Sequence, residues 1–216
     1  MKAQIYDQIE TLVEIPLESS EAIAPKGVRG AIVECYDDPE MYAVDLAIRD
    51  RRFAGGLAYH NVVLTPDQFD VFRYKALDIA KYFITLASPE QEDFITNLKL
   101  QKLLYYAQGF HLAMFDKPLF PEPIEAWQYG PAVPEIYRHY KQYSFGFIPQ
   151  PDDFDPEKYD KETQELLNEV YKLYGQYTAP ALMHFTQQEP PWKETSITEE
   201  IPHSLMKTYF ETQLVK

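Results

Sequence analysis

The pattern of apolar and polar positions changes character near residue 70. Before that point, apolar residues come in short runs rich in β-branched and aromatic side chains, separated by glycines and polar turn residues. The runs TLVEI, GAIVECY, MYAVDLAI and GGLAYHNVVL predict four or five short strands, and the turn DDPE joins the second and third as a hairpin. This number of short strands in about 65 residues predicts a small β-barrel.

After residue 70, the apolar positions repeat with the period of an α-helix. Helices are predicted at about 72–87, 98–113, 133–143, 160–177, 179–187 and 198–214. Thr96 or Asn97 can cap the second helix and Thr178 the fifth, which tolerates Pro180 in its first turn. The proline-rich residues between Phe115 and Ala132 predict an ordered loop or short extended pieces. The pattern therefore predicts an α+β chain with two domains, residues 1–70 and 71–216.

The second helix, LKLQKLLYYAQGFHLA, combines a core stripe with many polar side chains. The stripe consists of Leu100, Leu103, Leu104, Ala107, His111 and Met114. We interpret the leucines as core and His111 as a hydrogen-bonded core histidine rather than a catalyst.

The polar residues of this helix allow two interpretations. Tyr105 and Tyr106 lie about 100° apart on a helix, so we expect one of them at the edge of the core or outside it. Lys99 and Lys102 share a side of the helix. They can pair with acidic residues of the PEPIEAW loop, which we favour slightly, or contact a partner.

Composition narrows the class of protein. A formal net charge of −14, with both halves acidic, disfavours general binding to the phosphate backbone of nucleic acids. Cys35 is the single cysteine, so no internal disulfide can form. The first residues have no apolar core of a secretion signal, and no apolar run approaches the ~18 residues of a membrane span. These features predict a soluble cytoplasmic protein without a membrane partner.

Motifs of catalysis are missing from the sequence. There is no phosphate-binding glycine-rich loop, nucleophile elbow or zinc-protease motif, and the five histidines are scattered. We predict no catalytic residue, no cofactor and no metal. The run RDRR, Arg49 to Arg52, could contact nucleic acid, but a solvated strand end or turn is favoured.

The segment from Thr96 to Tyr140 resembles a known family. Leu98–Tyr105, Lys117–Phe120 and AWQYGPA (Ala126–Ala132) resemble the signature of the Panacea domain, the SocA-like and GepA-like antitoxin family, although Ala132 stands where valine is usual. In the later block, Thr186, Glu189, Pro191 and Trp192 also match the family pattern, and Gln187 stands where it has histidine. A role that needs this imidazole is therefore in doubt here.

The first 70 residues resemble a different family, one of small SH3-like barrels of unknown function with a turn like that at Leu64–Gln68. Together the two resemblances imply an α+β chain with an N-terminal SH3-like β-barrel and a mainly α-helical Panacea domain. Extra N-terminal domains in Panacea proteins are thought to help select the partner.

The Panacea resemblance implies a non-catalytic antitoxin that neutralises a cognate toxin by direct protein–protein binding. One alternative is an adaptor that delivers the toxin to a cytoplasmic protease; another is a nucleic-acid-binding regulator acting through the barrel. A homodimer is compatible with an antitoxin. Candidate partner-binding residues combine aromatic side chains, which are enriched at interfaces, with polar residues of the motifs: Lys99, Lys102, Tyr105, Tyr106, Trp127, Tyr129, Glu189 and Trp192.

Two of these candidate segments also have a structural interpretation. Gly130 before Pro131 predicts a turn that sets Trp127 and Tyr129 against the core. Trp192 can either cover the core or serve as an exposed anchor for a partner.

Overall fold

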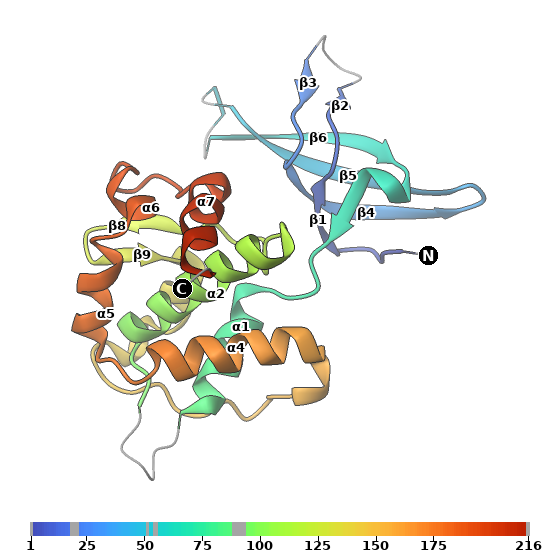
Figure 1. Cartoon of the computed structure of the whole chain (residues 1–216). Helices are drawn as coiled ribbons and strands as arrows, with labels where there is room; N and C mark the ends of the chain where they lie inside the picture. Colours follow the sequence, from blue (N-terminus) through green and yellow to red (C-terminus); the bar gives the residue numbers. More distant parts are fainter. Residues whose placement is uncertain (1, 18–21, 51, 54–55, 88–93, 215–216) are drawn as a thin grey trace. The chain divides into compact units, whose positions relative to one another are not determined.

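The computed structural model describes residues 2–17, 22–50, 52–53, 56–87 and 94–214. The chain forms two compact units, Met1–Arg73 and Tyr74–Lys216. The first unit is rich in strands and the second is mainly helical, so the mixed α and β composition predicted from the sequence is confirmed (Figure 1).

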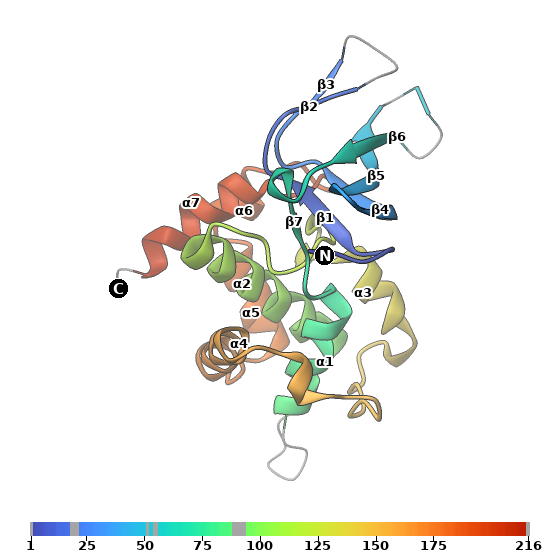
Figure 2. The same ribbon diagram turned by 90° about the vertical axis from the view of Figure 1, so that its right-hand side faces the viewer.

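The first unit is built on a five-stranded antiparallel sheet in the order β6-β5-β4-β1-β7. Its strands are β1 (Gln8–Thr11), β4 (Arg29–Asp37), β5 (Glu40–Arg49), β6 (Leu57–Leu64) and β7 (Phe69–Val71). The predicted hairpin is confirmed, because β4 and β5 pair as far as Asp37 and Glu40, the first and last residues of the DDPE turn. A separate ladder joins β2 (Ile15–Pro16) to β3 (Ile23–Ala24) (Figure 2).

The expected small barrel is not closed, because β6 and β7 lie at opposite edges of an open sheet in the described part of the chain. Strand β7 has only three residues and pairs with β1, so it does not continue far enough to close the sheet. The predicted strand TLVEI, residues 11–15, also does not form as a single strand. Strand β1 ends at Thr11 and β2 begins at Ile15, and the residues between them belong to neither strand.

Alternation along the strands directs one face of the sheet into a core. Ile9, Ile32, Val44 and Leu46 are completely buried in it. Phe69 packs edge-on against Tyr42, with ring centroids 5.2 Å apart. Period-two patterning therefore accounts for this core.

The second unit contains seven helices and one short hairpin among its described residues. The helices are α1 (Ala76–Leu86), α2 (Asn97–Phe115), α3 (Pro134–His139), α4 (Lys161–Tyr174), α5 (Ala179–Thr186), α6 (Pro190–Lys193) and α7 (His203–Leu214). The hairpin pairs β8 (Glu125–Trp127) with β9 (Gly130–Ala132). Short 3₁₀ helices lie at Pro66–Gln68 in the first unit and at Lys141–Tyr143 and Pro156–Lys158 in the second.

Helix α2 is the centre of the second unit, in contact with α1, α3, α4, α5, α7 and β9 (Figure 1). Leu100, Leu103, Leu104 and Ala107 are completely buried, as predicted. The predicted stripe ends early, because Met114 is 49% exposed. A helix buried on nearly all sides must place polar side chains in the interior, which determines the character of the site described below.

Two local features position α2 in the unit: a cap at its N-terminal end and a glycine where α7 packs against it. Thr96 is the cap, since its hydroxyl oxygen accepts a hydrogen bond from the Lys99 amide at 3.3 Å. A Cβ on Gly109 would lie 2.2 Å from the Phe210 ring, so glycine lets α7 approach α2 closely. Thr178 likewise caps α5, as predicted.

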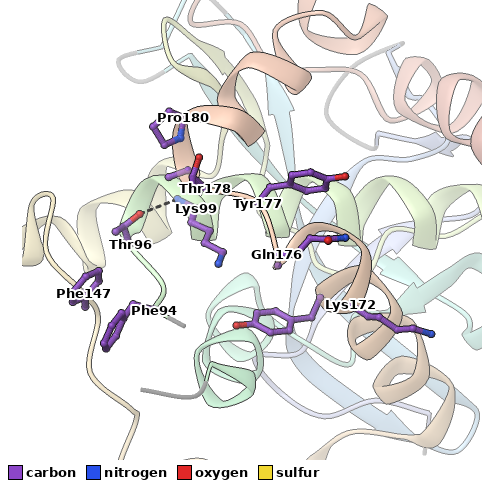
Figure 3. Close-up of a pocket in the computed structure, with 12 residues that line it drawn as sticks. Phe94, Thr96, Lys99, Phe147, Lys172, Gln176, Tyr177, Thr178 and Pro180 are labelled. Atoms are coloured by element: carbon purple, nitrogen blue, oxygen red, sulfur yellow. Dashed lines mark hydrogen bonds between the residues drawn. The ribbon is translucent and has the colours of Figure 1, made fainter. Parts of the chain in front are cut away.

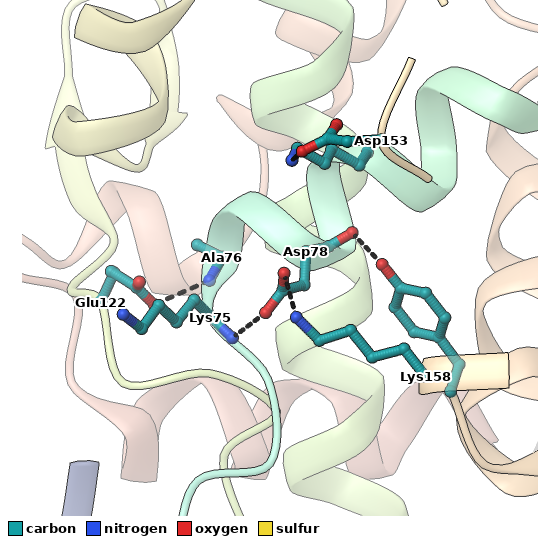
Figure 4. Close-up of polar contacts among 8 residues, drawn as sticks. Lys75, Ala76, Asp78, Glu122, Asp153 and Lys158 are labelled. Atoms are coloured by element: carbon teal, nitrogen blue, oxygen red, sulfur yellow. Dashed lines mark hydrogen bonds and ion pairs between the residues drawn. The ribbon is translucent and has the colours of Figure 1, made fainter. Parts of the chain in front are cut away.

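The N-terminal end of α1 is held by contacts within the second unit (Figure 4). The Lys75 amide donates to the Asp78 carboxylate at 2.9 Å, and the Lys158 ammonium pairs with the same carboxylate at 2.6 Å. The Ala76 amide donates to Glu122 at 2.9 Å, and burial raises the pKa of the Glu122 carboxyl. Helix α1 therefore begins at Ala76, four residues later than predicted.

Candidate functional site

The polar side chains of the α2 motif point into the protein. Lys99, Gln101, Lys102 and Gln108 are all buried, with exposed fractions between 0% and 7%. A buried polar group is costly unless it is hydrogen-bonded, so each of these side chains needs a partner in the fold.

Gln101 connects α2 to the segment after β9. Its side-chain oxygen accepts a hydrogen bond from the Val133 amide at 2.8 Å, and its amide nitrogen donates to Asn97 at 2.9 Å. Asn97 in turn donates to the carbonyl of Tyr137 in α3 at 3.0 Å. These contacts hold the start of α3 against the first two turns of α2.

Gln108 makes the corresponding connection to the KPLF motif. Its side-chain oxygen accepts from the Leu119 amide at 2.7 Å, and its amide nitrogen donates to the Phe120 carbonyl at 3.0 Å. His111 is half-buried and lies 2.6 Å from the Lys117 carbonyl, while burial lowers its pKa. The second family motif is thus ordered by hydrogen bonds from the first.

Lys102 lies at the β8–β9 hairpin. Its amine donates to the Pro131 carbonyl at 2.8 Å, and burial lowers its pKa to about 7. The predicted pairing with an acidic loop is therefore wrong for Lys102, because a backbone carbonyl is its partner. A Cβ on Gly130, whose φ is +91°, would lie 2.9 Å from the Lys102 amine and 2.8 Å from the Thr186 hydroxyl. The glycine of AWQYGPA is required by this close approach.

Glu189 joins α2 to the start of α6. Its carboxylate accepts hydrogen bonds from the hydroxyls of Tyr105 at 2.8 Å and Tyr106 at 2.9 Å. Burial raises the pKa of Glu189 to about 7, against the opposing effect of the tyrosine hydroxyls. Burial, reinforced by the nearby Glu189, also raises the pKa values of both tyrosines.

The expectation that one of the two tyrosines would lie at the edge or outside is wrong. Tyr105 is 0% and Tyr106 1% exposed. Successive helical positions can both be buried here because α7 covers one ring and Tyr174 of α4 stacks on the other, with ring centroids 3.7 Å apart. Local periodicity could not reveal that α2 is enclosed on both sides.

The two tryptophans are tied to the β8–β9 hairpin. The Trp192 indole donates to the Trp127 carbonyl at 2.9 Å, and the Trp127 indole donates to Glu125 at 2.7 Å. Both side chains are half-buried. Tyr129, by contrast, is 62% exposed, so the expectation that the turn sets it against the core is wrong.

Gln187, at the position where the family pattern has histidine, donates through its side-chain amide to the Gln128 carbonyl at 2.9 Å. This contact joins the end of α5 to the turn of the same hairpin. A side-chain N–H donor is thus available at this position without an imidazole ring.

The eight candidate partner-binding residues therefore lie at different depths in the second unit. Tyr129 is exposed, Trp127, Glu189 and Trp192 are half-buried, and Lys99, Lys102, Tyr105 and Tyr106 are buried. Because of their burial, direct contact with a partner is not favoured for Lys99, Lys102, Tyr105 and Tyr106. Their role in binding a partner stays a prediction.

An open groove that the sequence does not predict lies beside the N-terminal end of α2 (Figure 3). Residues from the segment 94–99, Phe147 and the segment 171–180 line this groove, whose volume is about 710 Å³. Lys99 is the one candidate residue that lines it. No sequence signal brings these segments together, because they converge only through the packing of α2 against α4 and α5.

Among the described residues, no group of three or more histidine, cysteine, aspartate or glutamate side chains could hold a metal ion. Every helix in that part of the chain is too short or too polar to cross a membrane. Asp50 pairs with Arg52 at 2.7 Å, which places a local ion pair in the RDRR run. Arg51 of that run lies outside the described residues.

The connections among α2, the KPLF loop, the β8–β9 hairpin and α6 link the segments that carry the family motifs. Residues 100–193 match the family model described as Antitoxin SocA-like, Panacea domain. A similar curated protein is the antitoxin SocA of Caulobacter vibrioides (strain NA1000 / CB15N), 50% identical over 44 residues. That alignment covers 20% of this chain and 23% of the relative, less than a quarter of its length. No solved structure matches the chain.

The Panacea match begins within α2 and ends with α6, so it contains Lys102, Glu189 and both tryptophans. Most motif residues described above either pack in the core or hold another motif segment in place, whereas Tyr129 is exposed. Polar residues of the matched segment are therefore the hydrogen-bonding partners that let α2 pass through the middle of the unit.

Proposed function

We propose that this chain is a cytoplasmic antitoxin that neutralises a cognate toxin by direct protein–protein contact and without catalysis. The match of residues 100–193 to the SocA-like antitoxin family is the observation that carries this proposal. The similarity to the antitoxin SocA over part of the same region supports it.

The use of the titratable groups favours binding over catalysis. Glu189 and Lys102 have pKa values of about 7, which would suit general acid–base catalysis. Both oxygens of Glu189, however, accept hydrogen bonds from tyrosine hydroxyls, and the Lys102 amine is held against the Pro131 carbonyl. Both groups are engaged in holding the Panacea fold together, so we assign them a structural role.

The test is co-expression of the chain with the product of the neighbouring gene. We expect that product to arrest growth alone, the chain to restore growth, and the two proteins to elute together in gel filtration. A neighbour that is harmless alone, together with the absence of a complex, would contradict the proposal.

Two further measurements distinguish direct binding from catalysis and from delivery to a protease. Glu189→Gln and His111→Ala variants that remain folded should neutralise as well as the unmodified chain, whereas a catalytic antitoxin would lose activity. Toxin half-life should be the same in cells with and without cytoplasmic proteases. A half-life that shortens only when a protease is present would indicate a proteolytic adaptor instead.

A further inference from the structure

The groove beside α2 has aromatic walls. Phe94 and Phe147 stack with ring centroids 4.0 Å apart, and Figure 3 shows them across the groove from Gln176 and Lys172. Phe147 is 55% and Tyr177 39% exposed. Exposed aromatic rings offer a large contact area at a low cost in side-chain entropy, which is typical of residues that anchor a partner.

The charge of the groove is opposite to that of the chain. Aspartate and glutamate outnumber lysine and arginine by 34 to 20 in the sequence. Among the described residues that line the groove, however, the charged ones are Lys99 and Lys172, both positive. The side chain of Lys99 extends into the opening between the two walls (Figure 3).

Two helices also begin at this groove, at the caps Thr96 and Thr178, which both line it. The N-terminal end of a helix carries a partial positive charge, which adds to that of the two lysines. Lys172 already pairs with Glu169 at 3.1 Å, but both side chains are more than 60% exposed. Such an exposed pair is weak, so a competing carboxylate can replace Glu169.

We propose that this groove binds an acidic segment of the toxin, with a carboxylate directed at Lys172 and an apolar side chain against Phe147 and Tyr177. The inference rests on the proposed antitoxin function and names the surface and the chemistry through which it acts. A volume of about 710 Å³ has room for a few side chains of such a segment.

Two substitutions test the groove, each with a matched control. Lys172→Glu reverses a charge at the groove; Lys161→Glu makes the same change on the same helix, and likewise breaks an exposed pair, with Glu165 at 3.5 Å. Phe147→Ala removes an aromatic wall; Phe145→Ala removes a 94% exposed ring two positions away that does not line the groove.

The first measurement uses a labelled synthetic peptide in which glutamates alternate with phenylalanines, and the same peptide with lysines in place of the glutamates. In fluorescence polarisation, the full chain should bind the acidic peptide and not the basic one. Lys172→Glu and Phe147→Ala should each weaken binding about tenfold, whereas the two control variants should bind like the unmodified chain. Absence of binding, equal binding of both peptides, or equal losses in the control variants would overturn the proposal.

The second measurement places the same four variants in the toxin neutralisation assay. Loss of neutralisation by the two groove variants alone would support the groove as the toxin-binding surface. If all four variants neutralise fully, the groove proposal fails and the antitoxin function stands. If the unmodified chain neutralises nothing, the proposed function fails, while peptide binding still reports whether the groove accepts acidic segments.

Discussion

Glu189, which is half-buried, and Lys102, which is buried, are titratable side chains that both favour their neutral forms. For Glu189, burial raises the pKa from 4.5 to about 7; for Lys102, burial lowers it from 10.5 to about 7. Because the unfolded chain has the ordinary values, both groups link the stability of the helical unit to pH. The contribution of Glu189 to stability falls with rising pH below neutrality, and that of Lys102 rises with pH above neutrality.

We expect the stability of the helical unit to fall as pH rises from about 4.5 to about 7, because the folded state holds the Glu189 proton more tightly than the unfolded state does. The upper limit of this effect is about 3 kcal/mol. Glu189→Gln should reduce this slope, since an amide does not titrate, and the remaining slope should include the contribution of Glu122, whose pKa burial also raises. Urea denaturation at several pH values measures it.

The control for this prediction is Glu165→Gln, which changes an exposed carboxyl on α4. Its pH profile should match that of the unmodified chain. An unchanged slope in Glu189→Gln would show that Glu189 is not the group responsible.

Lys102 should produce the opposite slope above neutrality. The unfolded state binds the Lys102 proton between pH 7 and 10.5 more tightly than the folded state does, so stability should rise with pH over this interval. Lys102→Met should flatten the profile there, at the cost of leaving the Pro131 carbonyl without its donor. The same urea titrations at alkaline pH measure the effect, and a slope that persists in Lys102→Met would contradict it.

Gly130 offers a test of the close approach at the hairpin. Gly130→Ala should destabilise the helical unit by at least about 2 kcal/mol, because the new Cβ meets the Thr186 hydroxyl and the Lys102 amine at a positive φ. Tyr129→Ala, in the same turn but exposed, should stay within about 0.5 kcal/mol. Thermal unfolding of both variants is the measurement, and equal losses would contradict the crowding argument.

At the scale of elements, the apolar pattern predicted the β4–β5 hairpin and placed the ends of α2, α4 and α5 close to where the structure has them. Helix α1 begins later and α3 ends earlier than predicted. The pattern missed α6, a four-residue helix whose two prolines suit only a first turn. It also placed the start of α7 five residues too early, although Pro202 directly precedes that helix. Short elements held by long-range contacts leave little periodicity to detect.

The packing of α7 on α2 is predicted to be essential for the helical unit. Phe210→Ala should reduce its free energy of unfolding by about 3–5 kcal/mol, because the ring is completely buried against Gly109, Tyr105 and Phe110. Leu214→Ala, on the same helix but 45% exposed, should have a small effect. Similar losses for both, in chemical denaturation, would contradict this role for α7.

At the scale of the whole molecule, the chain has two compact units, and we propose that each is an independent domain. The contacts that hold the start of α1, from Asp78, Glu122 and Lys158, all come from within the second unit. A fragment beginning at Tyr74 keeps every one of them.

We therefore expect residues 74–216 to fold alone and to unfold cooperatively at the midpoint that the helical unit shows in the full chain. Circular dichroism of the purified fragment measures this. A fragment that is unfolded, or that melts without a cooperative transition, would contradict the independence of the domain.

The sequence by itself determined the composition of the chain, the change from strands to helices near residue 70, and the Panacea resemblance of residues 96–140. These features depend on local periodicity and on short motifs, which can be recognised without knowing what packs against them. The sequence alone could not determine the role of the polar residues in those motifs.

Only the tertiary structure decided that role. Tyr105 meets Glu189 across 84 positions of the chain, and Lys102 meets the Pro131 carbonyl across 29. Whether a polar side chain is a surface contact or a buried partner depends on which distant segment covers it. The enclosure of α2 buried Lys102, Tyr105 and Tyr106 as internal hydrogen-bonding groups, and the convergence of α2, α4 and α5 formed a groove that no local pattern predicts.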